Sequence, residues 1–142
     1  MKNEYGRSMI EMLGVLAIIG VLSIGGLAGY TMAMNRHRAN QIMDYVSRCA
    51  VLHQTRGYGL DADMTATTCA ALMDSETAPV AGTYTVSGAT NGRFTITTPT
   101  LDTRVAEAIV NRSSTAAANG APTMTQSSGV VTFTFNPNNA GS

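Results

Sequence analysis

The dominant pattern in the chain is a long apolar run near its N-terminus. Residues 12–35 contain no charged side chain, and apart from Ser23, Thr31 and Asn35 every position is apolar or small. As an α-helix rising about 1.5 Å per residue, this run would measure about 36 Å, which exceeds the hydrocarbon thickness of a bilayer, about 30 Å. The pattern therefore predicts a membrane-spanning helix over residues 12–34.

A second pattern continues the helix beyond the apolar run. Apolar positions recur at steps of three and four residues and form one stripe: Ala39, Ile42, Met43, Val46, Cys49, Ala50 and His53. Polar residues, among them Asp44 and Arg48, take the other side, and the spacing of these two predicts an intrahelical ion pair. Gly57 and Gly59 favour a helix end. We expect a stem helix over residues 7–57.

The remainder, residues 58–142, carries strand and turn patterns. Polar and apolar residues alternate in four segments, and each pair of segments is separated by a turn-forming sequence. The segments are 83–86 and 93–97, with the turn at 88–92, and 123–126 and 131–135, with the turn at 127–129. Two short helices are expected, one over 66–73 and one from Leu101 to about Arg112, followed by a surface loop at 113–121. The predicted fold is α+β, a long N-terminal helix packed against a small antiparallel sheet in a globular head.

Charge and chemistry exclude several classes of function. Nine basic residues balance nine acidic residues, so the chain lacks the positive field that a nucleic acid would require, and nucleic acid is not expected as a main partner. No nucleophile and base, zinc spacing or phosphate-binding loop is recognisable. His37, His53, Asp61 and Asp63 do not form a ligand set. We expect no enzyme activity, no metal and no cofactor.

Glu11 distinguishes between the possible roles of the apolar run. A conventional cleaved signal has a shorter apolar region and a small-residue cleavage site, which the region around Ala28 does not offer. A plain single-pass anchor fits the length equally well. However, an ionised carboxylate at the start of a membrane segment costs a few kcal/mol unless a cation pairs with it. Glu11 is therefore a candidate functional residue, the alternative being a side chain that reaches the lipid headgroups.

The residues around Glu11 carry a family resemblance. The segment from Gly6 through Glu11 to Leu22 resembles the class III prepilin leader junction and stem of type IV pilins and type II secretion pseudopilins. In that family a short leader ends in Gly, a membrane peptidase cuts after it and methylates the new terminus, and Glu is the fifth mature residue. The order of elements in the head also resembles type IVb pilins.

The resemblance implies a life cycle and a set of partners. Residues 1–6 would be the leader, cleavage would fall between Gly6 and Arg7, and Arg7 would be N-methylated. The chain would be inserted as a single-pass protein in the inner membrane and then polymerise into an extracellular pilus or a periplasm-spanning filament. Its partners would be membrane lipid, the prepilin peptidase, the inner-membrane assembly platform and ATPase, and copies of itself. Glu11 would dock onto the new α-amino group of a neighbouring subunit.

The sequence also departs from the family pattern. Arg7 stands where the family usually has an apolar first mature residue, and the proline common within the apolar run is missing. Gly25, Gly26 and Gly29 lie near its place, and each costs about 1 kcal/mol in a helix interior relative to Ala. These glycines predict either a site where the stem bends during assembly or a surface where helices approach closely.

The two cysteines of the chain are Cys49 and Cys69. In an exported protein an even pair favours a disulfide, and closing a loop of about 20 residues would stabilise the head by roughly 3 kcal/mol. Two separate buried thiols are the alternative.

Three functions remain open at this point. The first is a structural pilus subunit. The second is a pseudopilin of a type II secretion or DNA-uptake system, although the acidic calcium-binding loop that major secretion pseudopilins share has no counterpart after Glu107. The third is an unrelated single-pass surface protein with a binding head.

Overall fold

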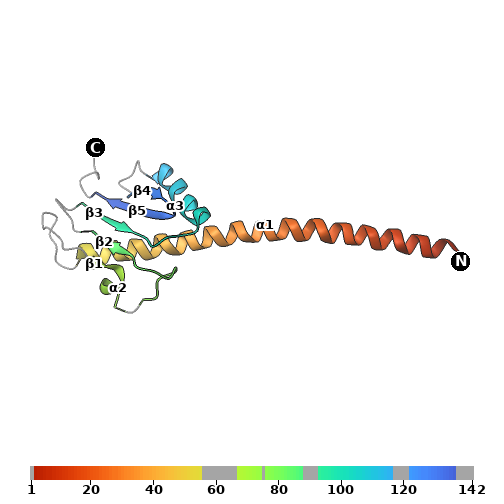
Figure 1. Ribbon diagram of the computed structural model, residues 1–142, viewed down its shortest axis with the longest axis horizontal. Helices are drawn as coiled ribbons and strands as arrows, with labels where there is room; N and C mark the ends of the chain where they lie inside the picture. Colours follow the sequence, from red (N-terminus) through yellow and green to blue (C-terminus); the bar gives the residue numbers. More distant parts are fainter. Residues whose placement is uncertain (1, 56–66, 75, 88–92, 117–121, 137–142) are drawn as a thin grey trace. The chain divides into compact units, whose positions relative to one another are not determined.

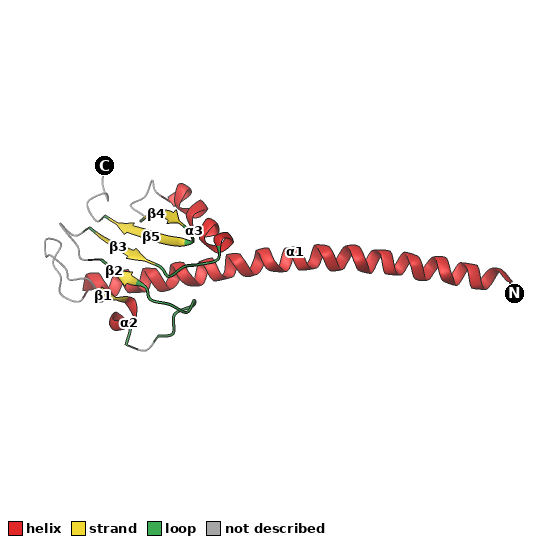
Figure 2. Cartoon of the chain, in the orientation of Figure 1, coloured by secondary structure: helices red, strands yellow, loops and turns green. Residues whose placement is uncertain are grey.

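The structure is a computed structural model that describes residues 2–55, 67–74, 76–87, 93–116 and 122–136. For residues 2–7 and 113–116 it describes the backbone alone. The contacts divide the chain into two units, Met1–Met34 and Asn35–Ser142, and the first helix runs through both. The α+β class predicted from the sequence is confirmed, because one long helix precedes a small antiparallel sheet (Figures 1 and 2).

Helix α1 spans Lys2–Thr55 and contains one stretch that is long and apolar enough to cross a membrane. The polar side chains inside the apolar run bond to the helix itself: the Ser23 hydroxyl donates to the Ile19 carbonyl over 2.7 Å, and the Thr31 hydroxyl donates to the Ala28 carbonyl over 2.9 Å. These bonds satisfy hydroxyl groups that would be costly to leave unpaired in hydrocarbon. The predicted helix end at Gly57 and Gly59 lies outside the described residues.

The sheet has five strands in the order β1-β2-β3-β5-β4, and every neighbouring pair is antiparallel. The strands are β1 (Thr67–Thr68), β2 (Thr85–Val86), β3 (Phe94–Thr97), β4 (Thr123–Ser127) and β5 (Val130–Phe135). The predicted pairing of segment 83–86 with 93–97 is confirmed, although the first strand is shorter, and the turn at 88–92 lies outside the described residues. The predicted hairpin of β4 and β5 is also confirmed.

The turn between β4 and β5 explains the second hairpin. Ser128 and Gly129 both have positive φ angles, 51° and 80°. Two positive φ angles at the centre of a two-residue turn match the twist of the flanking strands. The Gly129 carbonyl accepts a bond from the Leu101 amide over 2.8 Å, and a Cβ on Gly129 would lie 2.6 Å from the Leu101 carbonyl oxygen. This position therefore requires glycine for both its backbone angle and its close approach.

Two helix predictions need correction. Residues 66–73 do not form one helix, because Thr67 and Thr68 pair with β2, and helix α2 occupies only Cys69–Leu72. The Thr68 hydroxyl accepts a bond from the Ala71 amide and caps this helix. Helix α3 spans Thr103–Ala116 and does not end near Arg112, so the first part of the predicted loop 113–121 is helical. The Asp102 carboxylate accepts a bond from the Arg104 amide and caps the start of α3.

The core of the second unit lies on one face of the sheet, which we call the inner face. Side chains from the C-terminal half of α1, from α3 and from alternate strand positions are buried there together. Arg112 on α3 donates to the Asn40 amide oxygen on α1, so the two helices are joined over this face. The buried strand residues are Val86, Phe94, Ile96, Val131 and Phe133, and their helix partners include Ile42, Val46, Val105 and Ile109.

Candidate functional site

The candidate site of the first unit is the outside of α1 from residue 8 to residue 33, which we call the stem surface. Every residue in this range is exposed, and its large apolar side chains are between 52% and 75% exposed. Burying one side chain of this size is worth about 1.5–3 kcal/mol. An apolar surface of this extent is more stable against lipid or other protein than in water.

Glu11 is the charged residue of the stem surface. It is exposed, and among the residues whose side chains are described none forms an ion pair with it. Gly6 and Arg7, predicted as the cleavage site, lie in the same helix, but their side chains are outside the description. Arg7 precedes Glu11 by four residues, which is about 6 Å along the helix axis. Among the described side chains of its own chain, no cation is thus paired with the Glu11 carboxylate.

The glycines of the stem surface have no role in packing within the chain. A Cβ built on Gly14, Gly20, Gly25, Gly26 or Gly29 would meet no atom within 4 Å. Each glycine weakens the helix relative to alanine, so the described contacts give no reason for five of them. Their role would then lie in the close approach of a helix from another molecule or in a change of the geometry of the stem helix.

Cys49 and Cys69 form a disulfide, with 5.5 Å between their Cα atoms and both residues fully buried. The bond joins α1 to the start of α2, which immediately follows β1. β1 has two residues and α2 has four, so neither element is long enough to hold itself in place. The disulfide predicted from the sequence is confirmed, and it holds these two short elements against α1.

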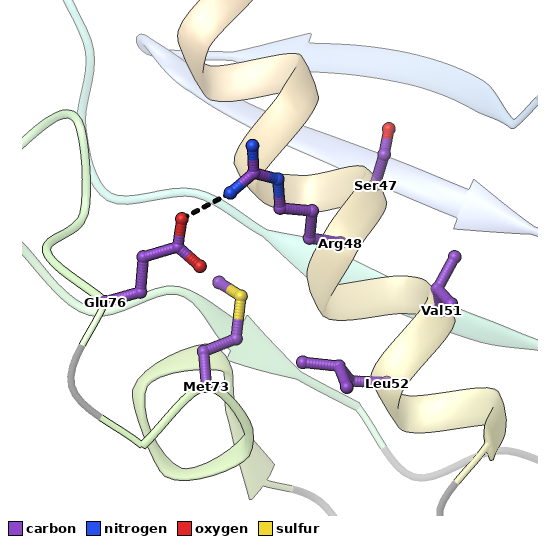
Figure 3. A pocket seen from close by; sticks show the side chains of 6 residues that line it. All are labelled: Ser47, Arg48, Val51, Leu52, Met73 and Glu76. Carbon is purple, nitrogen blue, oxygen red and sulfur yellow. Dashed lines mark hydrogen bonds and ion pairs between the residues drawn. The ribbon is translucent and has the colours of Figure 1, made fainter.

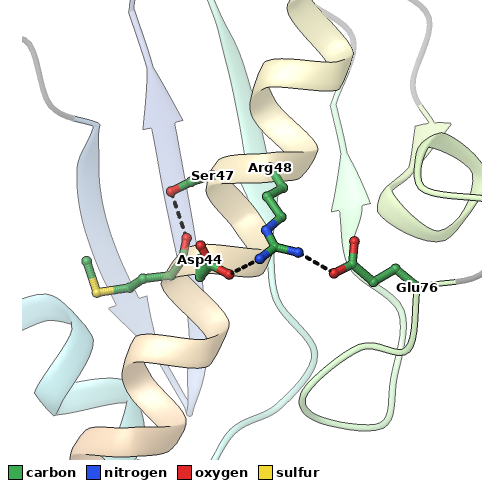
Figure 4. A network of polar contacts seen from close by, with 5 residues as sticks. Asp44, Ser47, Arg48 and Glu76 are labelled. Carbon is green, nitrogen blue, oxygen red and sulfur yellow. Dashed lines mark hydrogen bonds and ion pairs between the residues drawn. The ribbon is translucent and has the colours of Figure 1, made fainter.

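Arg48 connects α1 to the segment that follows α2 (Figure 4). Its guanidinium lies 2.9 Å from the Asp44 carboxylate, which confirms the ion pair predicted from the spacing, and 2.5 Å from the Glu76 carboxylate. Both pairs are about half exposed, so each contributes little on its own. Glu76 was not singled out in the sequence, because its partner is 28 residues away and no local pattern marks that distance.

A shallow groove of about 440 Å³ lies beside this ion pair (Figure 3). Its walls are mainly apolar and come from α1 and from the segment that follows α2. The residues that line it are Ser47, Arg48, Val51, Leu52, Met73 and Glu76. Val51 is 57% exposed, so the groove is open to solvent along α1.

Three titratable side chains lie in the core of the second unit. His53 is 1% exposed and meets the edge of Phe94 with 5.0 Å between the ring centres, and burial lowers its pKa. Tyr84 packs on Tyr45 with 4.9 Å between the ring centres. Burial, with a smaller effect from Tyr45, raises the pKa of Tyr84 to about 12. Burial, and then the Glu76 carboxylate, raises the pKa of Tyr45. At neutral pH we therefore expect His53 neutral and both tyrosines protonated.

In the described part of the chain, no three His, Cys, Asp or Glu residues gather in a way that could hold a metal ion. Asp61 and Asp63 lie outside the described residues. Comparison of the chain with protein-family models, with curated proteins and with solved structures found no match.

Proposed function

We propose that this chain is the precursor of a type IV pilin-like filament subunit, whose stem is held in the inner membrane before assembly and among the stems of its neighbours afterwards. The observation that carries the proposal is the stem surface, which is apolar, exposed along its whole length and charged only at Glu11. Both environments in the proposed cycle satisfy such a surface, since lipid tails and a bundle of identical helices are both apolar.

The position of Glu11 supports filament assembly in preference to simple anchoring. An anchor gains nothing from a carboxylate beside its apolar run, whereas a polymer gains a register. Cleavage after Gly6 would create an α-amino group on Arg7, and this cation could pair with Glu11 of a neighbouring subunit. In a helix bundle of low dielectric constant, a carboxylate without a cation is strongly disfavoured, so only the register that pairs the two charges would persist.

The open space around the stem glycines is consistent with the same proposal. Gly25 and Gly29 are four residues apart, so they lie on one side of the helix and let another backbone approach closely. In a filament, this side of the stem would face a neighbouring subunit. Bending at Gly25 and Gly26 during the transfer from lipid to filament would serve assembly as well.

The test is filament assembly by a Glu11→Gln variant, produced in the native host beside the matched control Glu107→Gln, which changes an exposed carboxylate on α3. Glutamine keeps the size of the side chain and removes its charge. We expect Glu11→Gln to be inserted and processed normally, but its amount in filaments sheared from the cell surface should be at least tenfold lower. The reason is that a loss of about 1.4 kcal/mol at each contact between subunits changes the equilibrium of that contact tenfold. Mass spectrometry of the sheared material gives the yield.

Two results would contradict the proposal. A wild-type chain that never enters sheared surface material is not a pilus subunit. A Glu11→Gln variant with the filament yield of Glu107→Gln shows that the carboxylate does not set the register.

A further inference from the structure

The face of the sheet opposite the core carries hydroxyl groups in two regular rows. The first row contains one threonine from each of the five strands, paired in register: Thr68, Thr85, Thr97, Thr132 and Thr125. The second row contains Ser87, Thr95, Thr134 and Thr123. We call these nine residues the threonine face. All of them are exposed or half-buried, whereas of the strand residues between them Val86, Ile96 and Phe133 are buried in the core and Met124 is partly buried against it.

The sheet fixes the spacing of this array. Neighbouring strands lie about 4.8 Å apart, and alternate residues on one strand lie about 6.7 Å apart. The threonines also have stiff side chains, because two heavy atoms on Cβ restrict their rotation. Within the second row, the Ser87 and Thr95 hydroxyls are 2.8 Å apart, and the Thr95 amide donates to the Ser87 hydroxyl over 3.0 Å. The array is therefore preorganised.

Fold stability alone does not explain the uniform chemistry of the threonine face. Threonine favours strands, but so do valine, isoleucine and tyrosine, and solvent-facing strand positions commonly carry lysine or glutamate to prevent aggregation. None of the nine positions is charged. Arg93, two residues before Thr95 along the chain, adds one exposed cation beside the middle of the second row.

Most hydroxyls of the first row are available to a ligand. The Thr68 hydroxyl accepts the capping bond of α2. Among the described residues, no hydrogen bond involves the side chains of Thr85, Thr97, Thr125 or Thr132. The β1 end of the face is also hollowed into a shallow groove of about 360 Å³, lined by Thr67, Thr68, Thr85, Val86, Ser87 and Thr97. A ligand would thus find a groove at one end and a flat row of hydroxyls beyond it.

We propose that the threonine face binds a neutral, extended polysaccharide that lies across the strands. Each hydroxyl both donates and accepts, as sugar hydroxyls do, so the two surfaces can pair without a charged group on either side. The step from strand to strand is comparable with the length of one sugar unit in an extended glycan, so successive units meet successive threonines. The threonine methyl groups contact the C–H faces of the sugars. This inference concerns the head and does not depend on filament assembly.

The experiment measures binding of the full chain, purified in a polyoxyethylene detergent without sugar groups, to microcrystalline cellulose by depletion from solution. Cellulose is an extended neutral glucan and serves as the probe. The test variant is the double substitution Thr97→Val and Thr132→Val, which keeps the shape and strand preference of both side chains and removes two central hydroxyls. The matched control is Ser47→Ala, which removes an exposed hydroxyl on α1 that bonds to the Met43 carbonyl.

We expect saturable binding by the wild type and by Ser47→Ala, and an affinity roughly 10- to 30-fold lower for the double variant, because each lost hydrogen bond is worth about 1 kcal/mol. Equal melting temperatures of the three proteins establish that the double variant is folded. Three outcomes would overturn the proposal. They are absence of binding by the wild type, equal binding by the double variant, and salt-sensitive binding to phosphocellulose alone, which would show that basic residues and not the hydroxyl rows make the interaction.

One alternative occupant is a second copy of this chain. Sedimentation of the wild type and the double variant at several concentrations separates it from the polysaccharide. Self-association that the double variant lacks, without any binding to cellulose, would assign the threonine face to contacts between subunits and would also overturn the proposal.

Discussion

His53 places a titratable group in the core of the head. Its ring meets the edge of Phe94, which stacks on Phe135 with 4.9 Å between the ring centres. A charged imidazole is poorly solvated there, so the folded chain takes up the proton at a lower pH than the unfolded chain does. The sequence placed His53 on the apolar stripe and thus predicted its burial, but only the structure identifies the aromatic rings against it.

The lowered pKa of His53 predicts that acid destabilises the head. Between the folded pKa and about 6.5, the ordinary value for the unfolded chain, the unfolded state binds more protons, so the free energy of unfolding rises with pH. The contribution of His53 is complete above pH 6.5 and is lost as the pH falls through the folded pKa. When the pH is lowered from 7.5 to 5, the melting temperature of His53→Leu should fall by less than that of the wild type.

The matched control is His37→Leu, because His37 is exposed. This variant should keep the wild-type pH dependence. If His53→Leu keeps it too, His53 does not control the acid sensitivity of the head.

Gly82 is a second residue whose role is visible only in the structure. Its φ angle is 139°, and a Cβ built on it would lie 2.4 Å from Cβ of Pro99. We expect Gly82→Ala to destabilise the head by about 1–3 kcal/mol, because both the backbone angle and the contact become strained. The control Gly26→Ala adds a Cβ in open space and should leave the melting temperature of the head unchanged. Equal melting of both variants would contradict the account of Gly82.

At the scale of elements, the sequence predicted the structure where local pattern and tertiary contacts agree. The β4–β5 hairpin was predicted because the alternation of residues 123–126 and 131–135 and the turn at Ser128 and Gly129 act together. Residues 66–73 were mispredicted as one helix because alanine and leucine favour helices locally. Pairing of Thr67 and Thr68 with β2 outweighs that preference, and no local signal reports a partner about 20 residues away.

The threonine face could not be predicted for the same reason, because local sequence does not report which strands pair. Seven of its eight threonines lay in the predicted alternating segments, whereas Thr68 lay in the mispredicted helix, and the rows themselves arise from the register of the strands. The order β1-β2-β3-β5-β4 places β5 between β3 and β4, so the row crosses segments distant in sequence. The stem behaves differently, because its exposure follows from the apolar run alone. For this reason Glu11 and the stem glycines could be selected from the sequence.

The disulfide sets the stability of the β1–α2 edge. It closes a loop between residues 20 positions apart, so removing it should lower the free energy of unfolding by about 3 kcal/mol. We expect the double variant Cys49→Ser and Cys69→Ser to unfold at a lower denaturant concentration than the wild type. The control is Ser47→Ala, which changes an exposed side chain on α1 and leaves the disulfide in place. An unchanged midpoint would show that the two short elements are held by their other contacts.

At the scale of the whole molecule, the two units differ in how their apolar side chains are packed. The first unit is a helix whose outside has no partner among the described residues, and the second has its own core, disulfide and sheet. In the proposed function, the first unit would provide the contacts between subunits and the second would form the surface of the filament. Helix α1, Lys2–Thr55, contains the boundary between the two units near Asn35.

In the proposed function, removal of a leader formed by residues 1–6 would convert the membrane-held precursor into the subunit that can assemble. As long as residues 1–6 are attached, Arg7 has no α-amino group, and Glu11 of a neighbouring subunit lacks its proposed cation. We therefore expect Gly6→Ala to remain at the mass of the full chain in membrane extracts, while the wild type loses residues 1–6 and gains one methyl group. Intact-mass measurement distinguishes the two forms directly.

Gly14→Ala is the matched control, because it makes the same change at a glycine in open space and away from the proposed cut. It should be processed like the wild type. A wild-type chain that keeps its full mass, or a Gly6→Ala chain that is trimmed as the wild type is, would remove the source of the α-amino group. Glu11 would then be the carboxylate of an ordinary membrane anchor that reaches the lipid headgroups.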